Sequence, residues 1–383
     1  MTPLKRVTLK GENMKESHYF TQFVNERNLS KATVKQYRAT LRQYCEFQGL
    51  SLDELINEAD SEEEQGIRMK KRTLKTRLVN FRCYIIESDS KNTIINKMNQ
   101  IKTFYRHFEL EIPTLPYLSE KNIRKEKPIA FEDIPSKTLI RESLDFANQM
   151  MKGFILLQCS SGMGKAECLS LSVGQFISAC GKMNENKSIH EMLIDIYSSK
   201  ELIIPTFHLK RQKVNEFYYT FCTAEAVHEI VKYLLNESFN ENRKLTLDAP
   251  LFKVSPNYVN TLMGQINDIL GCGKVNGQYN KIRTHMFRKF NATSLCNGEN
   301  ALTEEEIDFL QGRSRGRIRE TYLKKDPSAL KLKYMKAMDN VLINHESSVV
   351  NVQRRELERN EEKIGNILNL IETFDVHTIR ELQ

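Results

Sequence analysis

Near the end of the sequence, four residues have the types and the spacing to act together on a phosphate group. His285 and Arg288 stand three positions apart, and Tyr322 follows nine residues after Arg313. Residues three apart on a helix share one face, so the histidine and Arg288 could point at the same anion. The planar fork of an arginine engages two phosphate oxygens, while a histidine can donate a hydrogen bond or exchange a proton. The spacing therefore predicts an anion site on a helix.

Tyr322 is the candidate nucleophile of such a site. The pKa of a tyrosine hydroxyl is about 10, so it is a weak nucleophile until neighbouring cations stabilise the phenolate. Phosphoryl transfer needs mainly positioning and charge stabilisation, so a ring of cations around one tyrosine suffices without a metal ion. From Arg313 to Lys325 the sequence has six basic residues and one acidic residue. Taken singly, the same residues would be read as a solvated basic face and a half-buried tyrosine.

Composition agrees with an intracellular protein that binds a polyanion. The chain has 57 Lys and Arg against 49 Asp and Glu, a formal charge of +8, which fits a nucleic-acid partner without proving one. The eight cysteines are scattered without a Cys-x-x-Cys pair, so neither a zinc site nor a disulfide framework is predicted. No apolar run approaches the length of a membrane span. We expect a cytoplasmic protein with no cofactor, no bound metal and no membrane partner.

The length of 383 residues predicts two compact units with extensions. Residues 1–16 are expected to form a loose arm. Between Tyr19 and Phe47, apolar residues recur at three- and four-residue spacing, which predicts two amphipathic helices. Ser30 is the expected N-cap of the second helix, and Gly49 its expected end.

Two more helices complete the first predicted domain, residues 17–111. One spans residues 68–84 with a basic and an apolar face, and the other runs through residues 94–108. The basic face could neutralise several DNA phosphates. Its cations, with one more from the basic run before Tyr322, are the predicted DNA-binding residues: Lys70, Lys71, Arg72, Lys75, Arg77 and Arg315.

A linker is expected at residues 112–130, because Pro113 and Pro116 deny the backbone a helix and the composition turns polar. Residues 131–342 form the second predicted domain. In it, helices are expected at residues 135–151 and 154–171, and again from Ala224 to about Leu342, with loops at residues 248–252 and 271–279. Residues 191–221 favour strands that break at residues 214–216, which predicts an antiparallel hairpin. The fold class is therefore mainly α with a small antiparallel β-sheet.

The last segment, residues 343–383, is predicted to be a helical tail. Leu357, Ile364 and Ile371 stand seven residues apart. A helix this short is not stable alone, so it must pack on another surface. That surface belongs either to its own domain or to a neighbouring protomer.

These motifs closely resemble the tyrosine recombinase (phage integrase) family, and the residues after Tyr322 resemble its archaeal integrase-like members. In that family a His-x-x-Arg pair opens one helix, a Leu-Gly-His-Ser-like turn follows, and the nucleophilic tyrosine comes nine residues after that histidine. Here residues 310–314, Leu-Gln-Gly-Arg-Ser, match the turn, and Arg313 stands where the family usually has His or Trp. The resemblance covers about residues 17–342. It implies a two-domain clamp on duplex DNA, with a helical core-binding domain and a mixed α/β catalytic domain.

Residues 160–171 resemble a second family box, Gly-Leu-Arg-x-x-Glu-Leu-x-x-Leu, which carries the first catalytic arginine and a supporting acid. Gly162 and Glu167 fit that frame, but Gly164 stands at the arginine position. Lys165, one place later, is the nearest cation. It would offer one compact ammonium in place of a bidentate fork.

In the family, a lysine on a β-hairpin donates a proton to the departing 5′ oxygen. Lys213, next to the predicted break, matches it best, and Lys210 is the alternative. The catalytic set implied by the resemblance is Tyr322, Arg288, His285, Lys213, Arg313 and Lys165.

The resemblance implies a site-specific recombinase, for example a viral integrase, that acts on DNA in the nucleoid. It would cut and rejoin strands through a 3′-phosphotyrosine intermediate, without ATP or metal, as a homo-tetramer on paired sites. Two alternatives remain. A type IB topoisomerase would use the same tyrosine chemistry to relax supercoils, whereas a catalytically impaired DNA-binding protein would keep only the fold.

Overall fold

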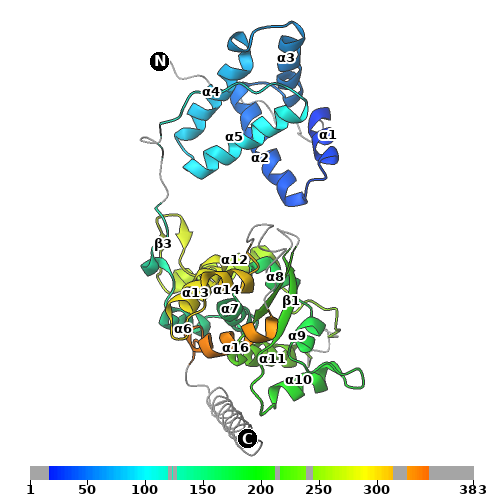
Figure 1. Ribbon diagram of the computed structural model, residues 1–383, viewed down its shortest axis with the longest axis vertical. Coiled ribbons are helices and arrows are strands. Elements are labelled where there is room, and N and C mark those ends of the chain that lie inside the picture. Colours follow the sequence, from blue (N-terminus) through cyan, green and yellow to red (C-terminus); the bar gives the residue numbers. More distant parts are fainter. Residues whose placement is uncertain are drawn as a thin grey trace, which may run out of the picture. The chain divides into compact units, whose positions relative to one another are not determined.

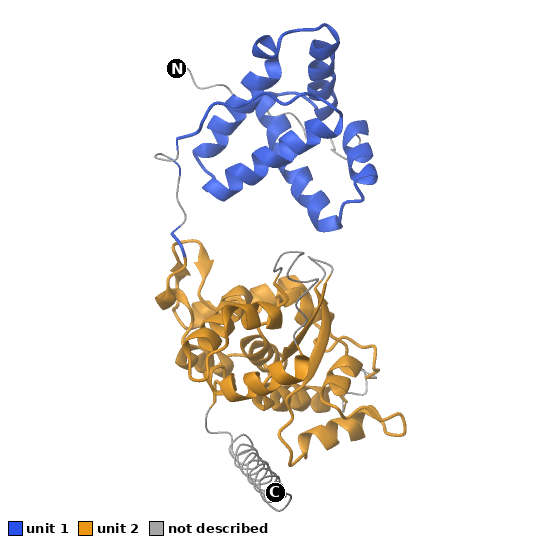
Figure 2. Ribbon diagram, viewed as in Figure 1, with its two compact units in different colours: residues 1–128 blue, residues 129–383 orange. Residues whose placement is uncertain are grey.

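The computed structural model describes residues 17–119, 123, 127–211, 216–238, 245–313 and 326–344. The chain divides into two compact units, residues 1–128 and 129–383 (Figure 2). The secondary structure is mainly α-helical with two small antiparallel sheets, which confirms the predicted fold class. In the described part of the chain, no helix is both long and apolar enough to cross a membrane.

Unit 1 is a helical domain (Figure 1). The Ser30 side chain accepts a hydrogen bond from the Thr33 N–H, and the following helix ends at Gly49 in the left-handed conformation, so both predicted boundaries are confirmed. Large buried side chains from several helices, such as Phe23, Tyr44 and Phe81, form the core. Its elements are α1 (His18–Glu26), α2 (Lys31–Gln48), α3 (Leu52–Glu64), η1 (Met69–Lys71), α4 (Thr73–Ile86) and α5 (Lys91–His107).

The basic stretch of unit 1 is not one continuous helix, so that prediction was wrong. Residues Met69–Lys71 form a single 3-10 turn, Arg72 is extended with φ −67° and ψ 140°, and the α-helix begins only at Thr73. Acids at the end of α3 cause this break. The Glu62 carboxylate accepts the Thr73 N–H at 2.9 Å, and the Arg72 guanidinium binds Glu63.

Unit 2 is built around α7, which is buried along most of its length, with α11 and α13 packed against it (Figure 1). Its helices are η3 (Phe131–Asp133), α6 (Lys137–Asp145), α7 (Gln149–Ser161), α8 (Lys165–Ser170), α9 (Val173–Ala179), α10 (Ile189–Tyr197), α11 (Ala224–Ser238), α12 (Pro256–Ile269), α13 (Thr284–Asn297), α14 (Glu304–Leu310), α16 (Pro327–Ala337) and η4 (Met338–Asn340). Its strands are β1 (Thr206–Arg211), β2 (Glu216–Phe221), β3 (Lys274–Val275) and β4 (Tyr279–Asn280).

The predicted antiparallel hairpin is present, since β1 pairs with β2 from Thr206 opposite Phe221 to Arg211 opposite Glu216. The strand prediction was wrong further upstream, where residues 189–197 form helix α10. Ser188 and Glu191 make a reciprocal capping box that starts this helix. The helix is favoured over the local β-propensity because the cap satisfies backbone N–H groups and the helix buries one apolar face.

Two predicted long helices are interrupted. Residues 135–151 divide into α6 and the start of α7, because the Asn148 side chain caps a new helix by accepting the Met151 N–H. Residues 154–171 divide at Gly162, which ends α7 with φ +66°, before α8 begins at Lys165. The small β3–β4 hairpin also extends through most of the loop expected at residues 271–279.

Candidate active site

Arg288 is the centre of the candidate site. It lies on α13 and is only 8% exposed. Its Nη1 donates to the Gly162 carbonyl oxygen at 2.7 Å, and its Nη2 donates to the Gln311 carbonyl oxygen at 2.6 Å. One guanidinium therefore joins the end of α7 to the turn after α14. Residues 160–171 and residues 310–314, the two segments singled out in the sequence beside the His285–Arg288 pair, therefore meet at this side chain.

A buried amide network fixes this junction. The Gln311 Nε2 donates to the Arg288 carbonyl oxygen at 3.1 Å and to Asn291 Oδ1 at 2.8 Å. The Asn291 Nδ2 in turn donates to the carbonyl oxygens of Cys159 and Ser160, at 3.0 and 2.8 Å. Buried polar groups of this kind are stable only when they are hydrogen-bonded. The network therefore limits how far α13, which carries Arg288, can move relative to α7 and the turn after α14.

Gly162 is required at the end of α7 for two reasons. Its φ of +66° is a conformation that side chains disfavour. In addition, a Cβ at this position would clash with Asn291 Oδ1 and would lie 2.7 Å from Gln311 Nε2. Any larger residue would disturb both the amide network and the carbonyl oxygen that holds Arg288.

Burial lowers the pKa of Arg288 to about 10, and the charges of Arg211 and Arg313 act in the same direction. Tyr218 and Glu167 oppose this shift. The guanidinium stays charged at neutral pH, but its environment disfavours that charge. A cation held under such conditions is an anion-binding group by its electrostatics.

His285 lies on α13 one turn before Arg288, and its side chain is exposed. Packing around the ring lowers its pKa, and four neighbouring cations lower it further: Arg283, Lys289, Arg288 and Arg313. The imidazole is therefore neutral at pH 7. In that state it can accept a proton from a hydroxyl group or donate a hydrogen bond.

Arg313 stands at the rim of this cluster. Its side chain is 43% exposed and makes an ion pair with Asp308 of α14 at 3.3 Å. Its charge reaches both His285 and Arg288, since it contributes to the lowered pKa of each. A partly exposed ion pair of this kind is weak, so Arg313 can exchange Asp308 for another anion.

Arg211 joins the cluster, although the sequence patterns did not single it out. It ends β1, and its Nη1 donates to the Gly312 carbonyl oxygen. Its Nε lies 3.9 Å from Glu167 Oε1, with the Arg211 side chain 20% exposed. A signal was available, because Phe207 and Leu209 are buried on the same strand. The two-residue period of a strand places position 211 on that inner face.

Lys165 is directed to a different part of the unit. Its Nζ donates to the Pro256 carbonyl oxygen at 3.2 Å and to Asn260 Oδ1 at 2.9 Å, both at the start of α12. Burial lowers its pKa. No hydrogen bond joins Lys165 to the Arg288 cluster among the residues that the structure describes.

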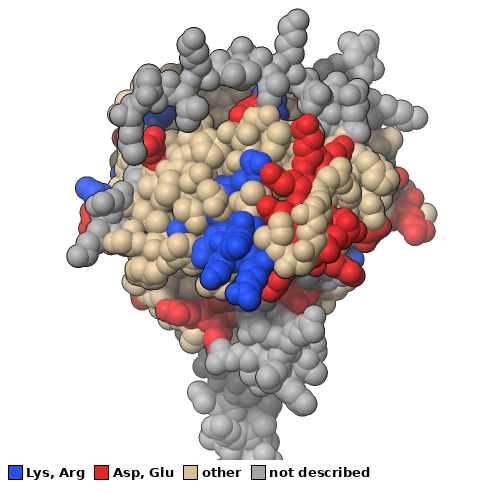
Figure 3. All heavy atoms as spheres, turned by 90° about the horizontal axis from the view of Figure 1, so that it is seen from above, with Lys and Arg blue, Asp and Glu red and all other residues tan. Residues whose placement is uncertain are grey.

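The predicted DNA-binding cations of unit 1 fall into two groups. Lys70 and Lys71 are exposed and Lys75 is half-buried. Arg77, in contrast, binds Glu58 through two hydrogen bonds of 2.6 and 2.8 Å, and Arg72 pairs with Glu63. Basic and acidic side chains also lie side by side on one face of the molecule (Figure 3).

Several predictions fall on residues outside the described ranges. These are the N-terminal arm at residues 1–16, the nucleophile Tyr322, the hairpin lysine Lys213, the DNA contact Arg315 and the tail from residue 345 onward. They remain predictions.

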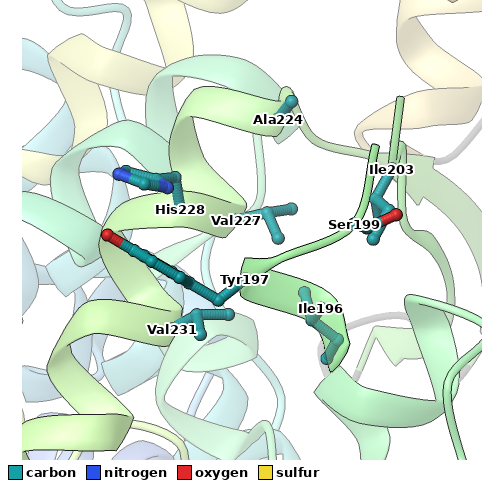
Figure 4. Close-up of a pocket in the computed structure, with 8 residues that line it drawn as sticks. All are labelled: Ile196, Tyr197, Ser199, Ile203, Ala224, Val227, His228 and Val231. Atoms are coloured by element: carbon teal, nitrogen blue, oxygen red, sulfur yellow. The ribbon is translucent and has the colours of Figure 1, made fainter. Parts of the chain in front are cut away.

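A small pocket between α10 and α11 contains none of the predicted catalytic residues. In it the ring of Tyr197 stacks on His228, with ring centroids 4.8 Å apart, beside Ile196 and Val231 (Figure 4). Burial lowers the pKa of His228. This neutral, largely apolar lining does not favour an anion.

No model of a known protein family matches the chain, and no curated protein matches it. Similar solved structures include the XerH site-specific recombinase bound to its difH substrate, with 12% identity, a TM-score of 0.46 and coverage of 82% of this chain and 80% of that one. The Tn1549 transposon integrase in complex with circular intermediate DNA has 13% identity, a TM-score of 0.42 and coverage of 89% and 98%. XerA recombinase has 15% identity, a TM-score of 0.31 and coverage of 83% and 95%.

Proposed function

We propose that this protein is a site-specific tyrosine recombinase that cuts and rejoins duplex DNA. One observation carries the proposal. The buried guanidinium of Arg288 is held between the Gly162 and Gln311 carbonyl oxygens, at 2.7 and 2.6 Å. It thus joins the two sequence boxes that resemble the family, at the turn that leads directly into the segment with Tyr322.

In the proposed reaction, the Tyr322 oxygen attacks the phosphorus of a DNA strand. The new bond is a 3′-phosphotyrosine, the bond that breaks joins phosphorus to the 5′ oxygen, and Lys213 gives that oxygen its proton. Arg288 stabilises the negative charge that builds on the phosphate oxygens, as preorganised donors do. His285 suits the removal of the tyrosine proton, because its lowered pKa keeps it neutral at pH 7. The phosphotyrosine keeps the energy of the cut bond, so a second strand can be joined without ATP.

Binding of duplex DNA likewise depends on positive side chains that contact phosphates. The exposed ammonium groups of Lys70 and Lys71 are free to contact phosphates, together with Lys75 and, in the segment before Tyr322, Arg315. Strand exchange needs two DNA sites, so we place a homo-tetramer on them, with the tail after residue 342 as a contact between protomers. We place the protein in the cytoplasm, on the nucleoid.

The test is covalent capture on DNA. A pool of nicked duplexes with random sequence is incubated with the protein, and adducts that survive denaturation are recovered and sequenced. A nick close to the cleavage position lets the short fragment with the free 5′ hydroxyl diffuse away, so the adduct accumulates. Tyr322→Phe should abolish the adduct and leave DNA affinity nearly unchanged, because it removes one hydroxyl and no positive charge. An adduct that survives in this variant would exclude Tyr322 as the nucleophile.

A catalytically impaired DNA-binding protein is the second candidate. The observation that favours it is the position of Lys165, whose Nζ is bound to Pro256 and Asn260 while Gly164 stands at the expected arginine position. Specific binding of duplexes without any adduct, in the wild-type protein, would favour this candidate over the recombinase.

A further inference from the structure

We infer that Arg211 is the second guanidinium of the phosphate site and acts in place of the arginine that is absent at position 164. The inference rests on the proposed function only for the identity of the anion, a DNA phosphate. The anion site itself follows from the contacts of Arg211, Arg288 and their neighbours.

Both guanidiniums contact the turn after α14. The Gln311 carbonyl oxygen accepts Arg288 Nη2 at 2.6 Å and lies 3.5 Å from Arg211 Nη1, which also donates to the Gly312 carbonyl oxygen. Two like charges this close repel each other, and Arg211 is the strongest charged influence on the lowered pKa of Arg288. An anion between the two forks would remove that repulsion and engage parallel donors from both.

Glu167 does not neutralise this charge through a hydrogen bond. Glu167 lies 3.9 Å from Arg211, beyond hydrogen-bonding distance. Within the described ranges, the hydrogen bonds of the Arg288 guanidinium go to carbonyl oxygens only. Two mostly buried arginines therefore lie side by side without a hydrogen bond from Glu167, and an uncompensated buried charge is costly unless a ligand completes the site.

Tyr218 supplies a further donor beside the two arginines. It is 3% exposed, and its hydroxyl has no hydrogen-bond partner among the described residues. Its ring packs against the turn, since a Cβ at Gly312 would lie 2.7 Å from it. The charges of Glu167, Arg288 and Arg211 all act on its pKa, which burial raises. An unpartnered buried hydroxyl at this place points to an oxygen ligand, either of an anion or of water.

Position 164 is a glycine and supplies no cation to this site. The Glu167 carboxylate folds back over the start of α8, next to Gly164. The acid thus occupies the space beside Gly164 and lies near Arg211 of β1 instead. The cation comes from the strand, not from α8, and Lys165 is released to bind α12.

The first test measures anion binding without any DNA. Thermal unfolding is followed in sodium phosphate and in sodium chloride of equal ionic strength. Phosphate that binds only the folded protein raises the melting temperature, in proportion to the logarithm of one plus its concentration over Kd. We expect Arg211→Gln to lose most of this shift, because it removes the charge but keeps a donor for the Gly312 carbonyl oxygen. Lys187→Ala is the matched control, since it removes one cation of an ion pair with Asp195 in the same unit and should keep the full shift.

The second test uses the captured DNA site. Arg211→Gln should slow adduct formation by about a hundredfold, as the loss of one preorganised donor does, whereas Lys165→Ala should change the rate little. A methylphosphonate at the cleaved position carries no negative charge. On this substrate the difference in adduct rate between the wild-type protein and Arg211→Gln should be smaller, because the reacting group then needs less stabilisation by a cation. A structural role would leave the same defect on both substrates.

The outcomes separate the two proposals. An unchanged phosphate shift in Arg211→Gln, or an unchanged adduct rate, overturns the role of Arg211. A phosphate shift that depends on Arg211, with no DNA adduct in the wild-type protein, keeps the anion site and overturns the recombinase. If Arg211→Gln does not fold, Arg211→Lys keeps the charge and should retain part of the phosphate shift.

Discussion

The two units each hold a pair of half-buried or buried arginines, but their partners differ. In unit 1, Arg77 and Arg72 bind the carboxylates of Glu58 and Glu63. In unit 2, Arg288 and Arg211 donate to carbonyl oxygens, and Glu167 lies 3.9 Å from Arg211. Carboxylates cancel the charge, whereas carbonyl oxygens orient a guanidinium and leave its charge in place. The first arrangement holds a fold together and the second prepares a site for an anion.

Removing Arg288 should have the largest effect. Arg288→Ala should slow adduct formation by up to about a thousandfold. It should also destabilise unit 2 by about 1–3 kcal/mol, because the Gly162 and Gln311 carbonyl oxygens lose their donor. Single-turnover adduct formation and urea unfolding measure the two effects. Arg288→Lys, which keeps the charge, should recover part of the rate. A normal rate in Arg288→Ala would remove this residue from the chemistry.

Breaking the Arg77–Glu58 pair should act on stability and not on DNA. Arg77→Ala leaves the Glu58 carboxylate without its partner, and we expect a loss of about 1–2 kcal/mol, between the values for exposed and buried pairs. DNA affinity should change little, because this charge is already neutralised. Urea unfolding and a binding titration measure the two quantities. The contrast between the units fails if Arg77→Ala weakens DNA binding as strongly as it weakens the fold.

The lysines of the basic stretch in unit 1, exposed Lys71 and half-buried Lys75, should behave in the opposite way. Lys71→Ala combined with Lys75→Ala should weaken binding to all sequences alike. The slope of log affinity against log salt should fall by about 0.9 for each DNA phosphate that the variant no longer neutralises. Titrations at several salt concentrations give the slope, with Arg72→Ala as the comparison. An unchanged slope in the double variant would make this stretch an ordinary solvated surface.

The smallest effect concerns His285 and pH. Its pKa is lower in the folded protein than in the unfolded chain, through burial and neighbouring cations. The unfolded state therefore binds more protons, so His285 contributes stability that is present above the unfolded pKa of about 6.5 and is lost as pH falls through the lower folded pKa. Urea unfolding from pH 7.5 to 5 should show this loss, and it should be weaker in His285→Gln. His228 shifts in the same direction and is present in both proteins, so it cancels. An equal pH dependence would place His285 outside the cation cluster.

Local sequence signals determined much of unit 1 and part of the site. The cap at Ser30 and the helix end at Gly49 depend on neighbouring backbone groups alone, so both can be predicted from the local sequence. The shared helix of His285 and Arg288 follows in the same way from a spacing of three. The period-two pattern likewise located β1 and β2, although it failed at α10, where a capping box outweighed β-propensity.

Only the tertiary structure decided whether each arginine contacts a carboxylate or a carbonyl oxygen. Arg77 and Glu58 are separated by 19 residues, and Arg211 and Gly312 by 101. No local pattern shows such pairings, because they form when helices and strands pack. Spacing also favoured Lys165, as the cation nearest to the expected arginine position. In the folded unit, Lys165 binds Pro256 and Asn260, and an arginine from a distant strand lies next to Arg288.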